Sequence, residues 1–258
     1  MAKLQIRILG SGTSQGIPLI GCDCYVCKSN NPKDNRLRSS ILFTWNNENF
    51  VIDTGPDFRQ QMLRENIQSL RAVIYTHEHK DHIAGMDDIR AFNYIEHRNM
   101  ELYASEETTT ALKREFYYAF GENQYPGTPK INLHTIKNEP FQLPDGPVVT
   151  PILGFHYKMI VFGFRIENFA YFTDVKTIPT NELEKMKNLD VLVLDCLKED
   201  QHISHLNLKE ALEIIDELKP KKAYLTHISH QFGTDEEINK KLPKNVFTAY
   251  DGLVIDID

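Results

Sequence analysis

Four potential metal ligands lie within six residues of one another, in the segment Thr-His-Glu-His-Lys-Asp-His at residues 76–82. They are His77, His79, Asp81 and His82. Imidazole and carboxylate donors together suit zinc, manganese or iron. An apolar run, Ala72 to Tyr75, precedes the segment and an expected helix follows Gly85, which favours a framed metal site over a solvated polar loop.

Two neighbouring ions need more than four donors, and three further candidates each close an apolar run. His156 follows the run that ends at Leu153, Asp174 follows Ala170 to Phe172, and His227 follows Ala223 to Thr226. Any one of them alone would be an ordinary structural residue. Together they favour ligation and predict a dinuclear active site that holds zinc or manganese.

Three of the four cysteines, Cys22, Cys24 and Cys27, lie within six residues. Three thiolates and one imidazole make a closed tetrahedral zinc site. We predict His230, three residues beyond His227, as the fourth ligand of this structural zinc. A redox role for the thiols is the weaker alternative, because a third thiol would complicate two-thiol exchange.

Strand-like and helical patterns alternate along the chain and predict an α/β protein. Strands are expected at Leu4–Leu9, Ile41–Trp45, Phe50–Ile52, Ala72–Tyr75, Val148–Leu153, Met159–Ile166, Ala170–Phe172, Val191–Leu194 and Ala223–Thr226. Helices are expected at Phe58–Glu65, Asp87–Ile95, Glu106–Phe120, Glu182–Lys187 and Leu208–Leu218, the last with a capping pair, Asn207 and Glu210.

The near-continuous apolar strands require burial on both faces, which two facing sheets with helices outside provide. The pattern therefore predicts a four-layer αββα sandwich. Residues 1–258 are expected to form a single domain, because the one loose stretch, Gly121 to Lys130, is too short to separate two folded units.

Charge and hydropathy bear on the partners. The formal net charge of −7 and pI near 5.8 argue against binding to long nucleic acid, which needs clustered Lys and Arg. The sequence has no apolar span of membrane length and no leader pattern, so we expect a cytoplasmic protein without membrane contact. A homodimer is a further expectation.

The chain resembles the metallo-β-lactamase superfamily, whose five short motifs match Asp53, residues 77–82, His156, Asp174 and His227 in that order. The resemblance implies that His77, His79 and His156 hold one metal. It implies that Asp81, His82 and His227 hold the second, and that Asp174 bridges the two. Asp53 would orient the ligand loop without binding metal, although alone it could equally be a strand-to-turn residue.

Within the superfamily, the cysteine pattern with its histidine resembles the PhnP-type cyclic phosphodiesterase group, as do Gly10–Pro18 and Gly85–Arg90. His205 precedes the expected helix start at Asn207, where free backbone N–H groups favour an anion. The resemblance implies that His205 faces the substrate and protonates a leaving alkoxide; otherwise it is an exposed loop histidine. We assign His205 and Asp81 to catalysis.

These features predict a phosphodiesterase that acts on small substrates such as cyclic nucleotide or sugar phosphodiesters. Two divalent metals would activate a water and polarise a phosphoryl oxygen. Three alternatives share much of the pattern: a lactone or thioester hydrolase, a nuclease that processes the 3′ ends of tRNA, and an inactive PqqB-like binding protein. The filled ligand positions argue against the inactive protein, and the absence of a basic insertion argues against the nuclease.

Overall fold

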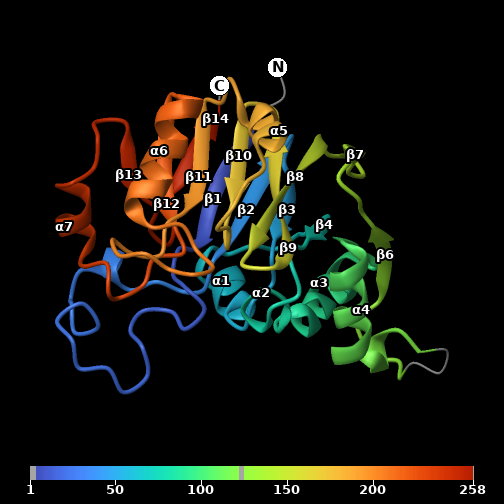
Figure 1. Ribbon diagram of the computed structural model, residues 1–258. Helices are drawn as coiled ribbons and strands as arrows, with labels where there is room; N and C mark the ends of the chain where they lie inside the picture. Colours follow the sequence, from blue (N-terminus) through green and yellow to red (C-terminus); the bar gives the residue numbers. More distant parts are fainter. Residues whose placement is uncertain (1–3, 122–124, 258) are drawn as a thin grey trace.

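The chain is described by a computed structural model that covers residues 4–121 and 125–257. Two mixed sheets of seven strands face each other, and helices cover both outer faces (Figure 1). The strand order is β14-β1-β2-β3-β4-β5-β6 in the first sheet and β13-β12-β11-β10-β9-β8-β7 in the second. The predicted four-layer αββα sandwich is confirmed.

The first sheet is built mainly from the amino-terminal half of the chain and the second from the carboxyl-terminal half. The strands of the first sheet are β1 Leu4–Gly10, β2 Ser40–Trp45, β3 Glu48–Ile52, β4 Ala72–Ile74, β5 Met100–Ala104, β6 Ile131–Thr135 and β14 Val254–Ile257. The strands of the second are β7 Phe141–Gln142, β8 Val148–His156, β9 Met159–Ile166, β10 Phe169–Phe172, β11 Val191–Asp195, β12 Lys222–Thr226 and β13 Val246–Thr248.

Seven α-helices are found in the described residues: α1 Phe58–Arg64, α2 Lys80–Ile83, α3 Arg90–Glu96, α4 Glu106–Glu115, α5 Thr180–Leu183, α6 Leu208–Leu218 and α7 Asp235–Asn239. None of the helices in this part of the chain combines the length and apolar character needed to cross a membrane. The Asn207–Glu210 capping box at the start of α6 has both of its reciprocal hydrogen bonds.

Three apolar clusters separate the four layers. Side chains such as Phe43, Phe50 and Phe164 fill the space between the sheets. Phe58 of α1 and Leu112 of α4 belong to the cluster on the outer face of the first sheet. The cluster on the outer face of the second sheet includes Ala211 and Ile215 of α6 together with Leu192 and Leu225. Because the sheets are buried on both faces, their strands are apolar on both faces.

Strand direction places the expected site residues at one edge of each sheet. Strands β3 to β6 run parallel to one another, as do β10 to β13. Strand β8 has the same direction as β10, because both pair antiparallel with β9. The carboxyl ends of β3 and β4 therefore share one edge of the first sheet, and those of β8, β10, β11 and β12 share one edge of the second.

Several helix predictions differ from the structure at their ends. The helix expected at Asp87–Ile95 is a 3₁₀ turn, Met86–Ile89, followed by α3. The one expected at Glu106–Phe120 ends at Glu115, because Phe116 leaves helical geometry and a 3₁₀ turn follows. The one expected at Glu182–Lys187 begins earlier, at Thr180, and becomes 3₁₀ at Glu184. In the loose stretch Gly121–Lys130, residues 122–124 lie outside the described residues.

Five strands, β5, β6, β7, β13 and β14, and two short helices, α2 and α7, were not predicted. The strands have two to five residues, and partners distant in sequence define them: β14 pairs with β1 across the whole chain. Edge strands such as β6 alternate polar and partly buried residues without a continuous apolar run. Local periodicity carries little information about such elements.

Phe172, which ends β10 two residues before Asp174, depends on two glycines. A Cβ at Gly163 would lie 2.5 Å from the Phe172 ring, and one at Gly154 would meet the same ring at 2.5 Å. The ring is fully buried. The glycines of β8 and β9 therefore leave the space that lets β10 carry Asp174 into place.

We expect Gly163→Ala to lower the free energy of unfolding by about 1–3 kcal/mol, because the added methyl overpacks the core. Gly121→Ala is the control, since the nearest atom to its Cβ would be 3.8 Å away; it should change stability by less than about 0.5 kcal/mol. Urea denaturation measures both. Equal stabilities for the two variants would contradict this account of Phe172.

Candidate metal centre

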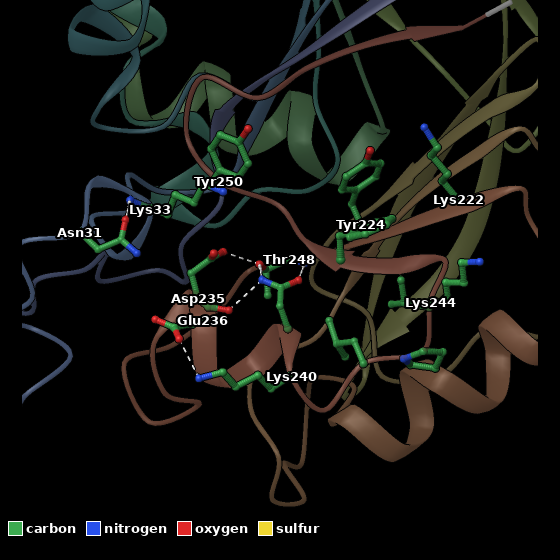
Figure 2. A pocket seen from close by; sticks show the side chains of 15 residues that line it. Asn31, Lys33, Lys222, Tyr224, Asp235, Glu236, Lys240, Lys244, Thr248 and Tyr250 are labelled. Carbon is green, nitrogen blue, oxygen red and sulfur yellow. Dashed lines mark hydrogen bonds and ion pairs between the residues drawn. The ribbon is translucent and has the colours of Figure 1, made fainter.

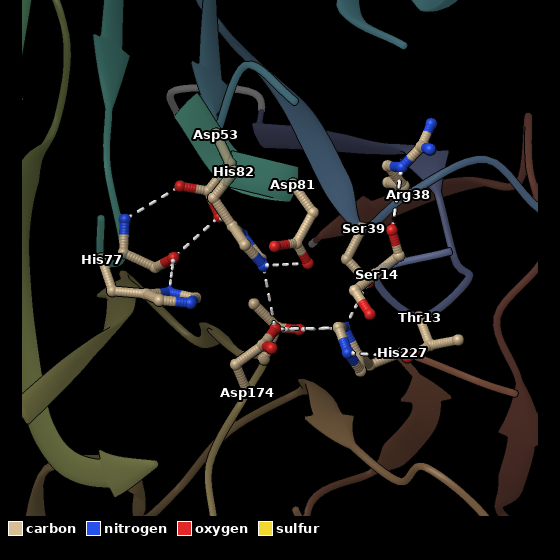
Figure 3. Close-up of polar contacts among 12 residues, drawn as sticks. Thr13, Ser14, Arg38, Ser39, Asp53, His77, Asp81, His82, Asp174 and His227 are labelled. Atoms are coloured by element: carbon tan, nitrogen blue, oxygen red, sulfur yellow. Dashed lines mark hydrogen bonds and ion pairs between the residues drawn. The ribbon is translucent and has the colours of Figure 1, made fainter. Parts of the chain in front are cut away.

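The strand ends converge on a group of imidazoles and carboxylates drawn from both sheets (Figure 3). From the first sheet come Asp53 after β3 and the 76–82 segment after β4. From the second come His156, Asp174, Asp195 and His227, at the ends of β8, β10, β11 and β12. The structure thus brings together residues that are far apart in sequence.

Within the 76–82 segment, a short helix sets the spacing of the donors. His79 is the N-cap of α2, so Asp81 and His82 lie in its first turn. The rings of His77 and His82 have centroids 4.2 Å apart, and those of His77 and His79 are 4.8 Å apart. His77 and His82 are buried, whereas His79 is exposed. The segment therefore presents donors both inward and toward solvent.

Asp174 joins the two sheets. Its Oδ2 lies 3.2 Å from Nε2 of His82 and 3.1 Å from Nδ1 of His227. Asp81 Oδ2 lies 3.2 Å from the same His82 nitrogen. Asp174 also forms a compact group with His77 and another with His156, so it lies between the ligands predicted for both ions, where a bridging carboxylate would lie.

Asp53 contacts the ligand segment rather than the open centre. It accepts hydrogen bonds from the Thr76 backbone N–H at 2.9 Å and the Thr76 hydroxyl at 2.8 Å. Its Oδ2 lies 2.7 Å from Nδ1 of His82. A carboxylate on one ring nitrogen fixes the orientation of the imidazole and leaves the other nitrogen for the centre.

Three of these residues have left-handed backbone. The φ angles of Asp53, Asp174 and His227 are 67°, 55° and 60°. This region is uncommon for residues other than glycine, although Asp and His enter it more readily than most. In each case the chain turns directly after a strand and aims the side chain at the centre. Backbone strain of this kind is frequent at functional sites.

His205 and His156 lie beside this group. The His205 ring is 4.5 Å from the His156 ring and 4.7 Å from the His227 ring, between centroids. Nδ1 of His205 is 3.3 Å from Oδ1 of Asp195. The structure buries His205 in the site, so it is not an exposed loop residue.

Asp195 is a site residue that the sequence analysis missed. Besides His205, it accepts hydrogen bonds from the backbone N–H groups of Asp174 and Leu206, both at 3.0 Å. It is fully buried and directly follows the apolar run Val191–Leu194. The strand-end rule that identified Asp174 would also have identified Asp195.

Burial and charge divide the imidazoles into two kinds. Burial lowers the pKa of His156 to about 4 and that of His77 well below its usual value, so both are neutral donors. Burial also disfavours charge on His82, but Asp174, Asp53 and Asp81 outweigh it and raise its pKa. Burial would lower the pKa of His205, but the Asp195 carboxylate outweighs it and raises that pKa to about 8.

The donor set fits divalent cations. Nε2 of His77 and Nδ1 of His156 are buried and have no hydrogen-bond partner within the described residues. The carboxylates of Asp53, Asp81 and Asp174 all lie within 3.2 Å of His82 nitrogens. Their combined negative charge favours a bound cation. Potential ligand atoms lie within 4.8 Å of one another in several groups, including His77, His82 and Asp174, and Asp81, Asp174 and His227. His156 and Asp174 form such a group with His205.

The cysteine site lies apart from this centre and is equally compact. The ligand atoms of Cys22, Cys24, Cys27 and His230 all lie within 4.8 Å of one another. The sulfurs of Cys22 and Cys24 are each 3.4 Å from Nδ1 of His230. The hydrogen bond from His230 lowers the pKa of the Cys24 thiol to about 6, which favours the thiolate that zinc binds. None of these three cysteines, nor Cys196, forms a disulfide bond in the structure.

Two cavities bear on where a ligand could lie. One of about 510 Å³ borders the metal centre and is lined by His79, His156, Tyr157, Lys158, Met159, Ile203 and Ser204. A larger one, of about 750 Å³, is lined by residues of β12, α7 and β13 and by none of the predicted ligands (Figure 2). Its carboxylates already have partners: Asp235 accepts from Thr248, and Glu236 pairs with Lys240.

The sequence profile of the β-lactamase superfamily domain matches residues 48–228. The chain therefore belongs to the β-lactamase superfamily, whose fold is that of metal-dependent hydrolases. A crystal structure described as a new diphosphatase from the PhnP family is 39% identical, with a TM-score of 0.93, and the match covers 100% of this chain and 98% of that one. The predicted PhnP-type resemblance is confirmed.

Two other relatives are similar to this chain over part of their length or in fold alone. An octanoyltransferase of Porphyromonas gingivalis is 37% identical over 97% of this chain and 51% of its own length. The chain thus spans about half the length of that curated relative. Zinc-bound PqqB of Methylobacterium extorquens has a TM-score of 0.80 at 17% identity, with 98% and 100% of the two chains covered, and shares the fold.

Removing one thiolate tests the cysteine site. We expect Cys24→Ser to lose one zinc per chain and to lower the melting temperature, because metal binding and folding are coupled in closed sites. Metal analysis by mass spectrometry and thermal unfolding measure the two effects. Cys196→Ser, at a buried cysteine outside the group, should keep the zinc. Full zinc content in Cys24→Ser would refute the site.

Proposed function

We propose that this chain is a dinuclear metal-dependent phosphodiesterase for small substrates, cyclic nucleotide or sugar phosphodiesters among them. The observation that carries the proposal is the His205–Asp195 pair beside the group of donors around Asp174. A buried imidazole backed by a carboxylate supplies a proton donor next to a site that fits two cations. Phosphodiester hydrolysis with an alkoxide leaving group needs both.

Each predicted ligand has a role in this proposal. His77, His79 and His156 would hold one cation, Asp81, His82 and His227 the other, and Asp174 would bridge them. Bound cations would supply a water activated for attack and charge stabilisation of the phosphoryl oxygens. Zinc and manganese both suit these donors. The cysteine site would hold a third, structural zinc.

His205 would protonate the leaving oxygen. With a pKa of about 8, its imidazole is mostly protonated at neutral pH. Asp195 occupies Nδ1, so the proton on Nε2 is the one available for transfer. The carboxylate also stops the ring from turning away. Protonation removes the need to expel a strongly basic alkoxide.

Relatives support a phosphate ester substrate, since the neighbour with 39% identity is described as a diphosphatase. The name octanoyltransferase belongs to a relative about twice as long, and it makes acyl ester or thioester hydrolysis the alternative to test. A panel of cyclic nucleotides, linear diesters, lactones and thioesters, with metals controlled, separates the two. Turnover of acyl substrates alone would overturn the proposal.

Replacing Asp174 tests the shared carboxylate. We expect Asp174→Ala to abolish diester hydrolysis and to lower the occupancy of both active-site metals, because each would lose a ligand. The zinc of the cysteine site should remain, and it provides an internal control in the same metal analysis. Wild-type activity in this variant would rule out the dinuclear mechanism.

Replacing His205 tests proton donation. We expect His205→Ala to lose on the order of 10² to 10⁴-fold in kcat on 2′,3′-cyclic AMP, whose leaving group is an alkoxide. On bis(4-nitrophenyl) phosphate the loss should be much smaller, because the phenolate leaves without a proton. His134→Ala, at an exposed histidine on β6, is the matched control. Equal losses on both substrates would assign His205 to binding instead.

A further inference from the structure

The cavity of about 510 Å³ beside the metal centre has two sides that the proposed function leaves unexplained. His79 and His156 form the side nearest the predicted metals. Tyr157, Lys158 and Met159 form a second side, and Ile203 with Ser204 forms a third. The reacting phosphate would lie at the histidines, so the remainder of the substrate would extend along the other two sides.

A tight turn fixes the second side to a predicted ligand. Strands β8 and β9 pair up to His156 and Met159, which leaves Tyr157 and Lys158 as a two-residue turn. Turns of this length define the positions of their side chains relative to the strands. Two residues span at most about 7 Å, so Lys158 stays close to His156.

Lys158 carries a positive charge that forms no ion pair in the part of the chain that the structure describes. Among the residues that line the cavity, only Lys158 carries a fixed positive charge. No ion pair of Lys158 is found in residues 4–121 and 125–257, and its ammonium lies 5.3 Å from the centroid of the Tyr157 ring. The metal centre next to it contains several carboxylates. Because no carboxylate of the described residues lines the cavity, the exposed ammonium of Lys158 is available to an anionic group of the substrate.

Two apolar side chains complete this part of the cavity. Tyr157 is 55% exposed and Ile203 is 66% exposed, so both have surface free to contact a ligand. Tyr157 also has a φ of 58°, where Gly or Asn would be less strained. Tyr157 therefore places an aromatic ring with free surface on the rim of the site, where a planar group of a ligand could contact it.

We propose that Tyr157, Lys158 and Ile203 form a subsite that selects diphosphate diesters carrying a planar group, an inference that rests on the proposed function. One phosphate would lie at the metal centre and the second at Lys158, with the planar group against Tyr157 and Ile203. Hydrolysis adds one water across the P–O–P link. A new P–O bond forms at one phosphorus, the bridging oxygen leaves with the other and is protonated, and two phosphate monoesters result.

The test compares Lys158→Met with wild type on two substrates. ADP-ribose has the second phosphate and a planar base, and bis(4-nitrophenyl) phosphate has a single phosphate. We expect KM for ADP-ribose to rise about 10-fold or more with little change in kcat, and KM for the aryl diester to change less than about 3-fold. Lys158→Arg should retain most of the affinity, because it keeps the charge.

The control is Lys244→Met, which removes an exposed lysine that lines the larger cavity (Figure 2) and should leave both KM values unchanged. Calorimetric titration with ADP gives a readout independent of turnover, and its Kd should rise in Lys158→Met only. Tyr157→Asn tests the planar contact: KM for ADP-ribose should rise while thermal stability stays the same or increases, since Asn tolerates this turn.

Each outcome decides one question. Equal changes on both substrates, or none on ADP-ribose and ADP binding, would overturn the subsite. Wild-type protein that cleaves the aryl diester but not ADP-ribose would also overturn it and leave the proposed function standing. Metal-loaded wild type that cleaves neither substrate would instead overturn the proposed function.

Discussion

Asp174 holds together imidazoles from the two halves of the chain. His82 comes from the helix that follows β4 in the first sheet, and His227 from the end of β12 in the second. A buried carboxylate is costly unless it has charged or hydrogen-bonding partners, and Asp174 has an imidazole on each side. Burial favours the neutral acid, but the two histidines outweigh it and hold the pKa of Asp174 well below its usual value. The contact between the donors of the two sheets and the charge balance of the centre thus depend on one side chain.

Two further carboxylates near Asp174 fix the orientation of the imidazoles that they contact. Asp53 takes one nitrogen of His82, and Asp195 takes one nitrogen of His205. His77 and His156 have no carboxylate in hydrogen-bond contact within the described residues and stay neutral because burial lowers their pKa values. In the proposed function, the same residue type would therefore supply cation ligands at some positions and a proton donor at another.

Much of this arrangement could be predicted, because donors at the ends of apolar strands are visible in sequence. Asp174, His156 and His227 followed from that rule, and the cysteine spacing led to the grouping with His230 that the structure displays. Asp195 satisfies the same rule but was missed, since it lies in no cluster of histidines or cysteines. The two-residue turn at Tyr157 was not predicted, because the expected strand ended at Leu153. The turn is defined by the pairing of His156 in β8 with Met159 in β9. The short strands β5, β6 and β14 are defined by distant partners, which local patterns do not encode.

The separation of the donors along the chain has a consequence for the order in which the molecule assembles. A chain that has folded only its first sheet holds the donors of the 76–82 segment without Asp174 or His227. Bringing residues 77 and 227 together requires closure of a long loop, which comes late because its entropy cost precedes any contact that offsets it. If the chain binds two cations as proposed, their capture would be among the last events of folding. Because the full set of donors exists only in the native state, metal binding would shift the folding equilibrium toward the completed sandwich.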